Sequence, residues 1–364
     1  PEYAALDGAR LATDIKGRRD GLPRAARRYY EHLARQVDIQ TSDASHEVQI
    51  RRSEGGRTRV TIRTLAGTGG ESGSPARVLF DREFRPDETK ALRLYLRGGD
   101  DLVVVDGGRS RIRLHVIAES GSKRVDDTAG GGTRIHDEHG VVTVLAGRGT
   151  RIDRKPYVLP SSESGFVDVE NVPPRDWGSD TIPIPEFGYE SDVGGYLGIA
   201  LAHTRYGFRK HPWSDKHSLA FGWATEAHEP RIRYQGRFRP ENSKRLYGLD
   251  LHYSGIDVLR FYGEGNETRD RGNDRFFRVR NEQFRIMPSL HVPFTDDKIR
   301  ISGGPYAQFS RTFNGTRLID DLDPYGNHKF GLVGAEGRFE LDTRRSVETN
   351  LDGLELPFHE NPAA

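Results

Sequence analysis

The chain has 364 residues, of which 30% are charged and 34% hydrophobic, and its formal net charge is only +1. This balance argues against a nucleic-acid-binding protein, in which positive charge is concentrated. Cysteine is absent, which excludes disulfides and thiolate metal sites. No stretch approaches the roughly 18–20 apolar residues of a membrane helix, so strands are the elements that could still cross a membrane.

The two ends of the chain suggest a piece of a longer protein. The sequence begins at Pro1, contains one methionine, Met287, and closes on the polar run LELPFHENPAA (354–364). We therefore expect an internal fragment, whose start carries no evidence on targeting.

The first part of the chain is predicted to be helical, followed by short strands. Apolar residues recur at helical spacing between Leu22 and Val37, and Pro23 suits a first helical turn. This pattern predicts helix over residues 1–40, and we assign residues 1–45 to the helical tail of an upstream region. Short alternating runs punctuated by Gly and Asp predict a compact β-rich module over residues 46–153. Residues 154–190 are Pro-rich and are expected to form an ordered linker.

The alternating runs lengthen in residues 191–345. Strands are predicted over 195–203, 217–225, 230–239, 246–254, 257–264, 279–292, 298–310 and 329–342. Most reach the about nine residues that a tilted strand needs to cross a bilayer. The connections after the second, fourth and sixth runs are short, and those after the first, fifth and seventh are long. Short turns on one rim and long loops on the other are typical of an outer-membrane barrel. We therefore predict an all-β protein with about eight strands of such a barrel over residues 191–345, and residues 346–364 as a truncated connection.

The stretch RIRYQGRF (231–238) assigns the two faces of this sheet. Arginines alternate with apolar residues at a strand's period of two. The predicted lipid-facing residues are Leu219, Phe221, Trp223, Ile232, Tyr234, Phe238, Tyr247, Leu249 and Leu251. The predicted lumen-facing residues are Arg231, Arg233, Gln235, Arg237, Asp250 and His252, as a selectivity lining or simply an ion-paired interior. An Arg at the lipid midplane would cost about 2–4 kcal/mol, so this register is favoured.

One segment resembles a known family. Tyr189, Ser191, Asp192 and Gly194, the strand that follows them and YGFRKHPW (206–213) resemble the opening of the barrel in BamA/TamA-type outer membrane proteins of the bacterial surface antigen superfamily. VLFDREFRPDETKALRLYLRGGDDLVVVDGG (78–108) resembles the β module that precedes the barrel in a subgroup, some members of which carry a calcineurin-like metallophosphoesterase domain. The chain departs from the family in having eight predicted strands of about sixteen and no Arg-Gly-Phe/Tyr loop motif.

The resemblance implies a function and a seam strand. It implies insertion or translocation of polypeptides at the bacterial outer membrane, with the N-terminal part in the periplasm. A polypeptide client could add to an exposed strand edge. The implied seam residues are Gly195, Tyr196, Leu197, Gly198, Ile199, Ala200, Leu201, Ala202 and His203. Two alternatives remain: a passive barrel anchor or porin for an upstream phosphoesterase-like domain, and a soluble β-sandwich or lipocalin-like binding protein.

Two charged clusters are weaker candidates. Asp100, Asp101 and Asp106 could bind Ca²⁺ as in a calcium β-roll, but the glycine register is broken and tight β-turns explain the same residues. Arg209, Lys210 and Lys216 could contact lipopolysaccharide phosphates, or belong to an ordinary loop with interfacial aromatic residues. We expect no enzymatic activity, no cofactor and no nucleic-acid partner; lipid, lipopolysaccharide and a polypeptide client are the expected partners.

Overall fold

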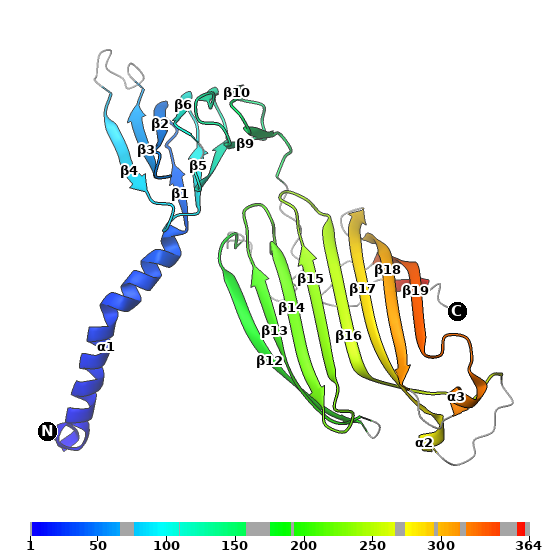
Figure 1. Cartoon of the computed structure of the whole chain (residues 1–364). Helices are drawn as coiled ribbons and strands as arrows, with labels where there is room; N and C mark the ends of the chain where they lie inside the picture. The colour runs from blue at the N-terminus through cyan, green and yellow to red at the C-terminus, as the bar shows by residue number, and fades with distance from the viewer. Residues whose placement is uncertain are drawn as a thin grey trace. The chain divides into compact units, whose positions relative to one another are not determined.

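The computed structural model describes residues 2–65, 76–108, 110–157, 175–190, 193–265, 274–294, 298–313, 318–342 and 355–360. The chain divides into two compact units, Pro1–Tyr157 and Val158–Ala364 (Figure 1). Among the described helices, none has the length and hydropathy of a membrane span. The motif residues Ser191 and Asp192, and much of the predicted linker and of the predicted C-terminal connection, lie outside the described residues.

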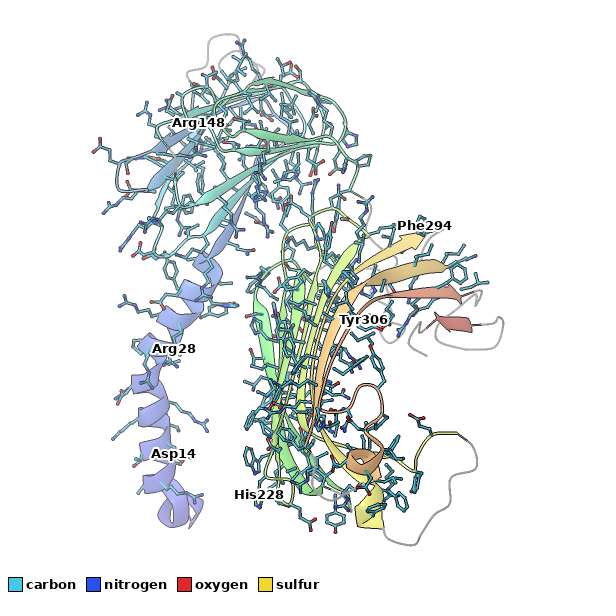
Figure 2. The ribbon with its side chains drawn as sticks, turned by 45° about the vertical axis from the view of Figure 1, so that its right-hand side comes forward. Asp14, Arg28, Arg148, His228, Phe294 and Tyr306 are labelled. Carbon is cyan, nitrogen blue, oxygen red and sulfur yellow. The ribbon has the colours of Figure 1, made fainter. Side chains whose placement is uncertain are left out.

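A single long helix opens the chain. Helix α1 spans Glu2–Ala34, and its side chains, Asp14 and Arg28 among them, project outward (Figure 2). Pro23, which we predicted for a first turn, lies inside the helix, because the helix begins well upstream of it.

The predicted helix is too long at its C-terminal end. Gln36–Gln40 forms strand β1, which pairs in parallel with a later strand, β5 (Ala91–Leu96). Val37 and Ile39 alternate with polar residues and contact the apolar core of the first unit. The helical prediction for residues 36–40 is therefore wrong, since tertiary packing selects the strand's period.

The first unit is a solenoid of short strands. Its other strands are β2 (His46–Arg52), β3 (Thr58–Thr64), β4 (Val78–Phe84), β6 (Asp101–Asp106), β7 (Arg113–Ala118), β8 (Lys123–Asp126), β9 (Arg134–Asp137), β10 (Val142–Leu145) and β11 (Arg151–Asp153). One sheet has the order β1-β5-β7-β9-β11, and the other β10-β8-β6-β2-β3-β4. From β5 to β11 the chain alternates between the sheets, and from β7 onward each strand pairs in parallel with the strand two places earlier. The short strands predicted over residues 46–153 are present; β2, β3 and β4 pair antiparallel, and the later strands form parallel coils.

The two solenoid sheets enclose one apolar core. Leu94 on β5, Val105 on β6 and Val116 on β7 are each at most 1% exposed and belong to a single buried cluster. Burial of one such side chain contributes about 1.5–3 kcal/mol, so this core is the main stabilising element of the unit.

Glycines fill the corners where one coil lies on the next. Gly99 and Gly121 have φ of 72° and 80°, in the left-handed region. A Cβ built on Gly121 would lie 1.9 Å from the carbonyl oxygen of Gly99. The coils therefore stack at this corner only because neither position has a side chain.

The second unit contains one antiparallel sheet of nine strands. They are β12 (Ser179–Glu190), β13 (Gly194–Arg205), β14 (Asp215–Ala224), β15 (Pro230–Phe238), β16 (Leu246–Arg260), β17 (Arg278–Phe294), β18 (Ile299–Phe313), β19 (Lys329–Asp342) and β20 (Glu355–Glu360), with short helices α2 (Asp274–Phe277) and α3 (Leu318–Leu322). The strands follow chain order, and within the described residues β12 and β20 do not pair, so the sheet is open.

Several predicted boundaries in this unit are wrong. β12 lies in the predicted linker, and β20 lies in the predicted truncated connection. The runs 246–254 and 257–264, predicted as two strands, belong largely to one strand, β16, whose register shifts between Ser254 and Asp257. The Ser-Gly-Ile sequence there resembles a turn but forms a β-bulge, because β17 continues to pair on both sides of it.

Joining these two runs overturns the predicted alternation of loop lengths. The entry rim, where β12 begins, carries the connections 206–214, 239–245 and 295–298. The far rim carries 191–193, 225–229 with His228, 261–277 with α2 and 314–328 with α3 (Figures 1 and 2). Short and long connections therefore occur on the same rim, so the predicted separation of short turns from long loops, which indicated a barrel, is wrong.

Candidate functional site

The pairing register divides the nine-strand sheet into two different faces. All nine predicted lipid-facing residues share one face, as in the pairs Leu219–Tyr234 and Tyr234–Leu251. The same face continues across the later strands through Phe284–Phe309 and Ile301–Phe339. We call this side the apolar face.

Large side chains on the apolar face are exposed. Leu197 on β13 is 66% exposed and Val333 on β19 is 82% exposed. Other members of the face that exceed one-third exposure include Ile199, Leu201, Leu219, Phe221, Trp223, Ile232, Phe238, Tyr247, Phe294 and Phe309. A contiguous exposed apolar surface of this kind marks an interaction surface.

The six predicted lumen-facing residues all lie on the opposite face, which we call the charged face. Arg233 Nη2 lies 2.6 Å from Glu186 Oε1, and Arg237 Nη1 lies 3.1 Å from Asp250 Oδ1. Arg231 contacts Asp257 at 3.4 Å. The carboxylate partners of Arg231 and Arg237 thus lie on the adjacent strand β16, whereas the Glu186 partner of Arg233 lies on β12, three strands away.

Small residues leave room on the charged face for larger side chains. The Tyr196 ring covers Gly222, where a Cβ would lie 2.1 Å from its hydroxyl oxygen. That hydroxyl donates to Glu186 Oε2 at 3.2 Å. Tyr306 covers Gly334 in the same way (Figure 2). Both tyrosine rings therefore lie over a glycine on this face, and Tyr196 lies beside the Arg233–Glu186 ion pair.

The predicted seam strand is not an edge. Residues Gly195–His203 lie within β13, which pairs with β12 on one side and β14 on the other. The edge strand is β12, which was not predicted because its Pro-rich segment was assigned to the linker. This corrects the predicted location of the free edge.

Two prolines lie on the free edge of β12. The Tyr206 amide donates to the Gly178 carbonyl at 3.0 Å, and this pair continues the β12–β13 register. Because hydrogen-bonded pairs alternate along antiparallel strands, the odd-numbered β12 residues direct their backbone groups away from β13. Pro183 and Pro185 are among them. The free edge therefore keeps its carbonyl acceptors at these positions but lacks two amide donors.

The residues predicted to contact lipopolysaccharide lie at the entry rim. Arg205, which precedes loop 206–214, pairs with Ser179, the first residue of β12. Arg209 is only 8% exposed, and Lys216 Nζ lies 4.9 Å from the Trp213 ring centroid. Burial of Arg209 is unfavourable for a contact with an external phosphate, and the lipopolysaccharide contact of Arg209, Lys210 and Lys216 stays a prediction.

The three predicted calcium ligands do not converge among the described residues. Asp101 and Asp106 are at opposite ends of β6. The buried Asp101 carboxylate instead contacts Lys123 Nζ at 2.6 Å and His46 Nδ1 at 3.1 Å. Asp100 accepts a hydrogen bond from the Ser122 amide at 2.9 Å. These carboxylates stabilise solenoid corners, which corrects the calcium assignment.

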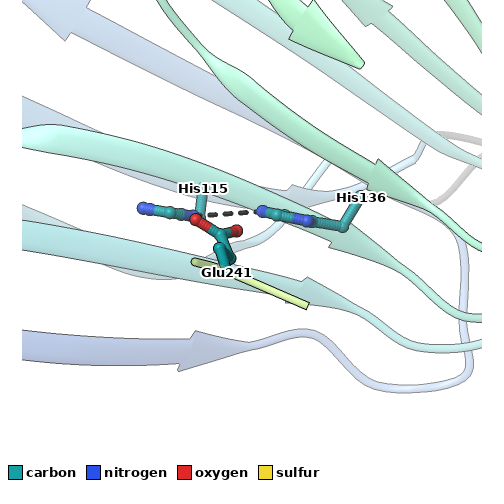
Figure 3. Close-up of side chains that lie close together, drawn as sticks. All are labelled: His115, His136 and Glu241. Carbon is teal, nitrogen blue, oxygen red and sulfur yellow. Dashed lines mark hydrogen bonds between the residues drawn. The ribbon is translucent and has the colours of Figure 1, made fainter. Parts of the chain in front are cut away.

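A histidine pair lies on one solenoid sheet. His115 Nδ1 and His136 Nε2 are 3.1 Å apart, and the two rings are stacked with their planes 3° apart (Figure 3). Burial, together with the positive charge of His136 and Arg134, lowers the pKa of His115 to about 3. A neutral His115 can share one N–H···N hydrogen bond with its neighbour.

A repeated tetrapeptide was not among the predicted sites. Gly-Thr-Arg-Ile occurs at 132–135 and again at 149–152. The pairing of β9 with β11 places Arg134 directly beside Arg151. Both repeats border a pocket of about 260 Å³ in the first unit. Self-comparison of the sequence would have found this signal.

Comparison with known proteins gives no relative: no family model, no curated protein and no solved structure matches this chain.

Proposed function

We propose that the second unit is part of a transmembrane β-barrel of an outer membrane, with its apolar face toward lipid and its charged face toward a water-filled lumen. The observation that carries this proposal is the continuous apolar face, which extends in register over β13 to β19. Alternation of apolar-out and polar-in residues is what a barrel in lipid requires.

The opposite face supports the same proposal. A soluble β-sandwich would cover the apolar face with a second sheet, whereas the described part of the second unit contains one sheet. The ion pairs of Arg231, Arg233 and Arg237 suit a hydrated interior, in which charges remain solvated and partnered.

We further propose that the barrel assists insertion or translocation of polypeptides, as its resemblance to BamA/TamA-type proteins implies. The free edge of β12 supports this activity. A strand that adds there finds carbonyl acceptors but loses the donors of Pro183 and Pro185. Pairing along this edge is therefore weak, which allows a client strand to exchange on and off it.

Tryptophan fluorescence tests the orientation of the sheet. The chain has three tryptophans, and Trp223 lies on the apolar face. The variant Trp177→Phe/Trp213→Phe leaves Trp223 alone, and Trp177→Phe/Trp223→Phe leaves Trp213 alone as a matched control. Trp223 is the last residue but one of β14 and would lie near a membrane interface, so in vesicles of lipid brominated on the upper part of the acyl chains we expect strong quenching of Trp223 and little quenching of Trp213. Equal quenching of the two, or none of Trp223, would contradict the membrane proposal.

Photo-crosslinking tests the activity at the edge. A benzoyl-phenylalanine in place of Phe187 on β12 should crosslink to a purified unfolded outer-membrane protein supplied during its insertion. The same residue in place of Phe221, in the middle of the sheet, should not. Crosslinking that is no stronger at Phe187 than at Phe221 would favour a passive anchor or porin.

A further inference from the structure

We propose that the pocket beside the two Gly-Thr-Arg-Ile repeats binds a phosphate or sulfate group through Arg113, Arg134 and Arg151. This pocket lies entirely within the first unit, so the proposal does not depend on the membrane assignment of the second. Its lining residues are Arg52, Ser110, Ile112, Arg113, Leu114, Gly131, Gly132, Arg134, Gly149 and Arg151.

One buried carboxylate holds both repeats in place. Asp127, which is fully buried, accepts hydrogen bonds from Thr133 Oγ1 at 2.8 Å and from Thr150 Oγ1 at 2.5 Å. Gly132 and Gly149 precede these threonines with φ of 75° and 82°. The same local geometry therefore recurs on consecutive coils and presents the following arginine at the same place each time.

This repetition places like charges side by side. Arg134 and Arg151 are register partners on adjacent parallel strands, which lie about 4.8 Å apart. Like charges directly opposite one another destabilise a sheet. An oxyanion between the two guanidinium groups would turn this repulsion into attraction, and the planar guanidinium fork matches phosphate oxygens in pairs.

A buried arginine lies at the back of the pocket. Arg52 is 8% exposed; its Nη1 donates to the Gly131 carbonyl at 2.6 Å and its Nη2 to Thr133 Oγ1 at 3.4 Å. Its Nε is buried and has no hydrogen-bond partner among the described residues. Burial lowers the pKa of Arg52, while the charge of Asp127 acts in the opposite direction. Arg52 therefore fixes the Gly131–Thr133 corner and adds positive charge behind the outer arginines.

The pocket's size and lining define the ligand class. Its volume of about 260 Å³ is below the roughly 300–1,000 Å³ of sites that enclose whole organic ligands. No acidic side chain is among its described lining residues, whereas four arginines are. This composition suits a small oxyanion, or the terminal phosphate of a larger molecule whose remainder stays outside.

Calorimetric titration of the full chain tests the proposal. Inorganic phosphate and soluble dihexanoyl phosphatidic acid are titrated separately, so that a free anion is distinguished from a lipid phosphate. We expect binding of at least one probe by the unmodified protein. Arg134→Gln/Arg151→Gln should weaken it at least tenfold. The matched control Arg51→Gln/Arg124→Gln removes the same charge from exposed positions outside the pocket and should bind as the unmodified protein does.

A third double variant distinguishes loss of binding from loss of folding. Arg134→Lys/Arg151→Lys keeps the charge but not the guanidinium fork, and should bind more weakly than the unmodified protein while unfolding at a similar temperature. Whichever probe binds should raise the melting temperature of the unmodified protein and the control, but not of Arg134→Gln/Arg151→Gln. Absence of binding for both probes, or equal loss in the two Gln double variants, would overturn the proposal.

Discussion

The two units use the same alternation of apolar and polar residues for opposite purposes. In the solenoid, apolar side chains such as Leu94 and Val116 point between two sheets and are buried. In the nine-strand sheet, Leu219 and Phe221 have the same period but are about half exposed. The difference teaches that a period of two assigns residues to faces but does not say what covers each face. A second sheet covers the apolar face in the first unit, and we propose that lipid covers it in the second.

The buried polar groups differ in the same way. In the solenoid, Lys123 and Asp101 form an ion pair whose side chains are fully buried. On the charged face of the second unit, the Arg233 side chain remains 47% exposed although it is paired with Glu186. The Lys123–Asp101 pair is thus part of a buried core, whereas the Arg233–Glu186 pair remains in contact with solvent.

The largest expected effect is on the solenoid's buried ion pair. Lys123→Met leaves the Asp101 carboxylate buried without its cation, so the free energy of unfolding should fall by about 3–5 kcal/mol. Denaturant unfolding of the full chain measures this change. Arg124→Met, at the adjacent exposed position, is the control and should change the free energy by less than about 0.5 kcal/mol. Similar values for the two variants would show that this pair does not stabilise the unit.

A prediction with a somewhat smaller effect tests whether lipid covers the apolar face of the second unit. Leu219→Arg places a charge in the middle of β14 on the apolar face. In phospholipid vesicles this should cost about 2–4 kcal/mol, because the charge would lie in the hydrocarbon. Gln235→Arg, on the charged face of β15, should be nearly neutral. Urea unfolding of the vesicle-bound protein compares them, and equal stabilities would mean that lipid does not cover Leu219.

The solenoid's corner should respond to a single methyl group. Gly121→Ala places a Cβ against the Gly99 carbonyl at a positive φ, so we expect a loss of about 1–3 kcal/mol. Gly108→Ala is the control, because its Cβ would meet no atom within 4 Å. Thermal unfolding of both variants measures the effect, and equal melting temperatures would contradict close stacking at this corner.

The smallest expected effect is a pH dependence from His115. Its pKa is lowered from 6.5 to about 3 in the folded protein. Below pH 6.5 the unfolded chain therefore binds a proton that the folded protein does not, and stability is lost as the pH falls toward 3. Between pH 7 and 5.5 this contribution is about 1 kcal/mol. His115→Gln should remove that part of the slope, whereas the exposed control His139→Gln should keep it. An unchanged slope in His115→Gln would exclude His115 as its source.

Much of the fold was predictable because side-chain alternation is a local property. The sequence predicted a helix over residues 1–40, of which the structure has 2–34, and it predicted short strands in the module and the separation of Arg233 from Tyr234 onto different faces. The predictions were wrong where the residues of one structure are also typical of another. Prolines at 183 and 185 suggested a linker, but a strand tolerates proline at a free edge. Ser254–Gly255–Ile256 suggested a turn, but formed a bulge.

The candidate sites were less predictable, because they depend on residues far apart in the chain. Asp101 appeared to be a cation ligand until the fold placed Lys123 and His46 beside it. Self-comparison of the sequence could have found the two repeats, but only the pairing of β9 with β11 places Arg134 beside Arg151.

The amino-acid sequence by itself determined which residues share a face, since backbone geometry sends successive side chains of a strand to opposite sides. It also determined the corners at which only glycine can adopt the required φ. The tertiary structure alone decided that the solenoid strands from β5 to β11 pair in parallel and that β12, not β13, is the edge of the large sheet. Strand order and register arise from hydrogen bonding and packing between segments far apart in the chain, so the sequence of one segment does not determine which strand it pairs with.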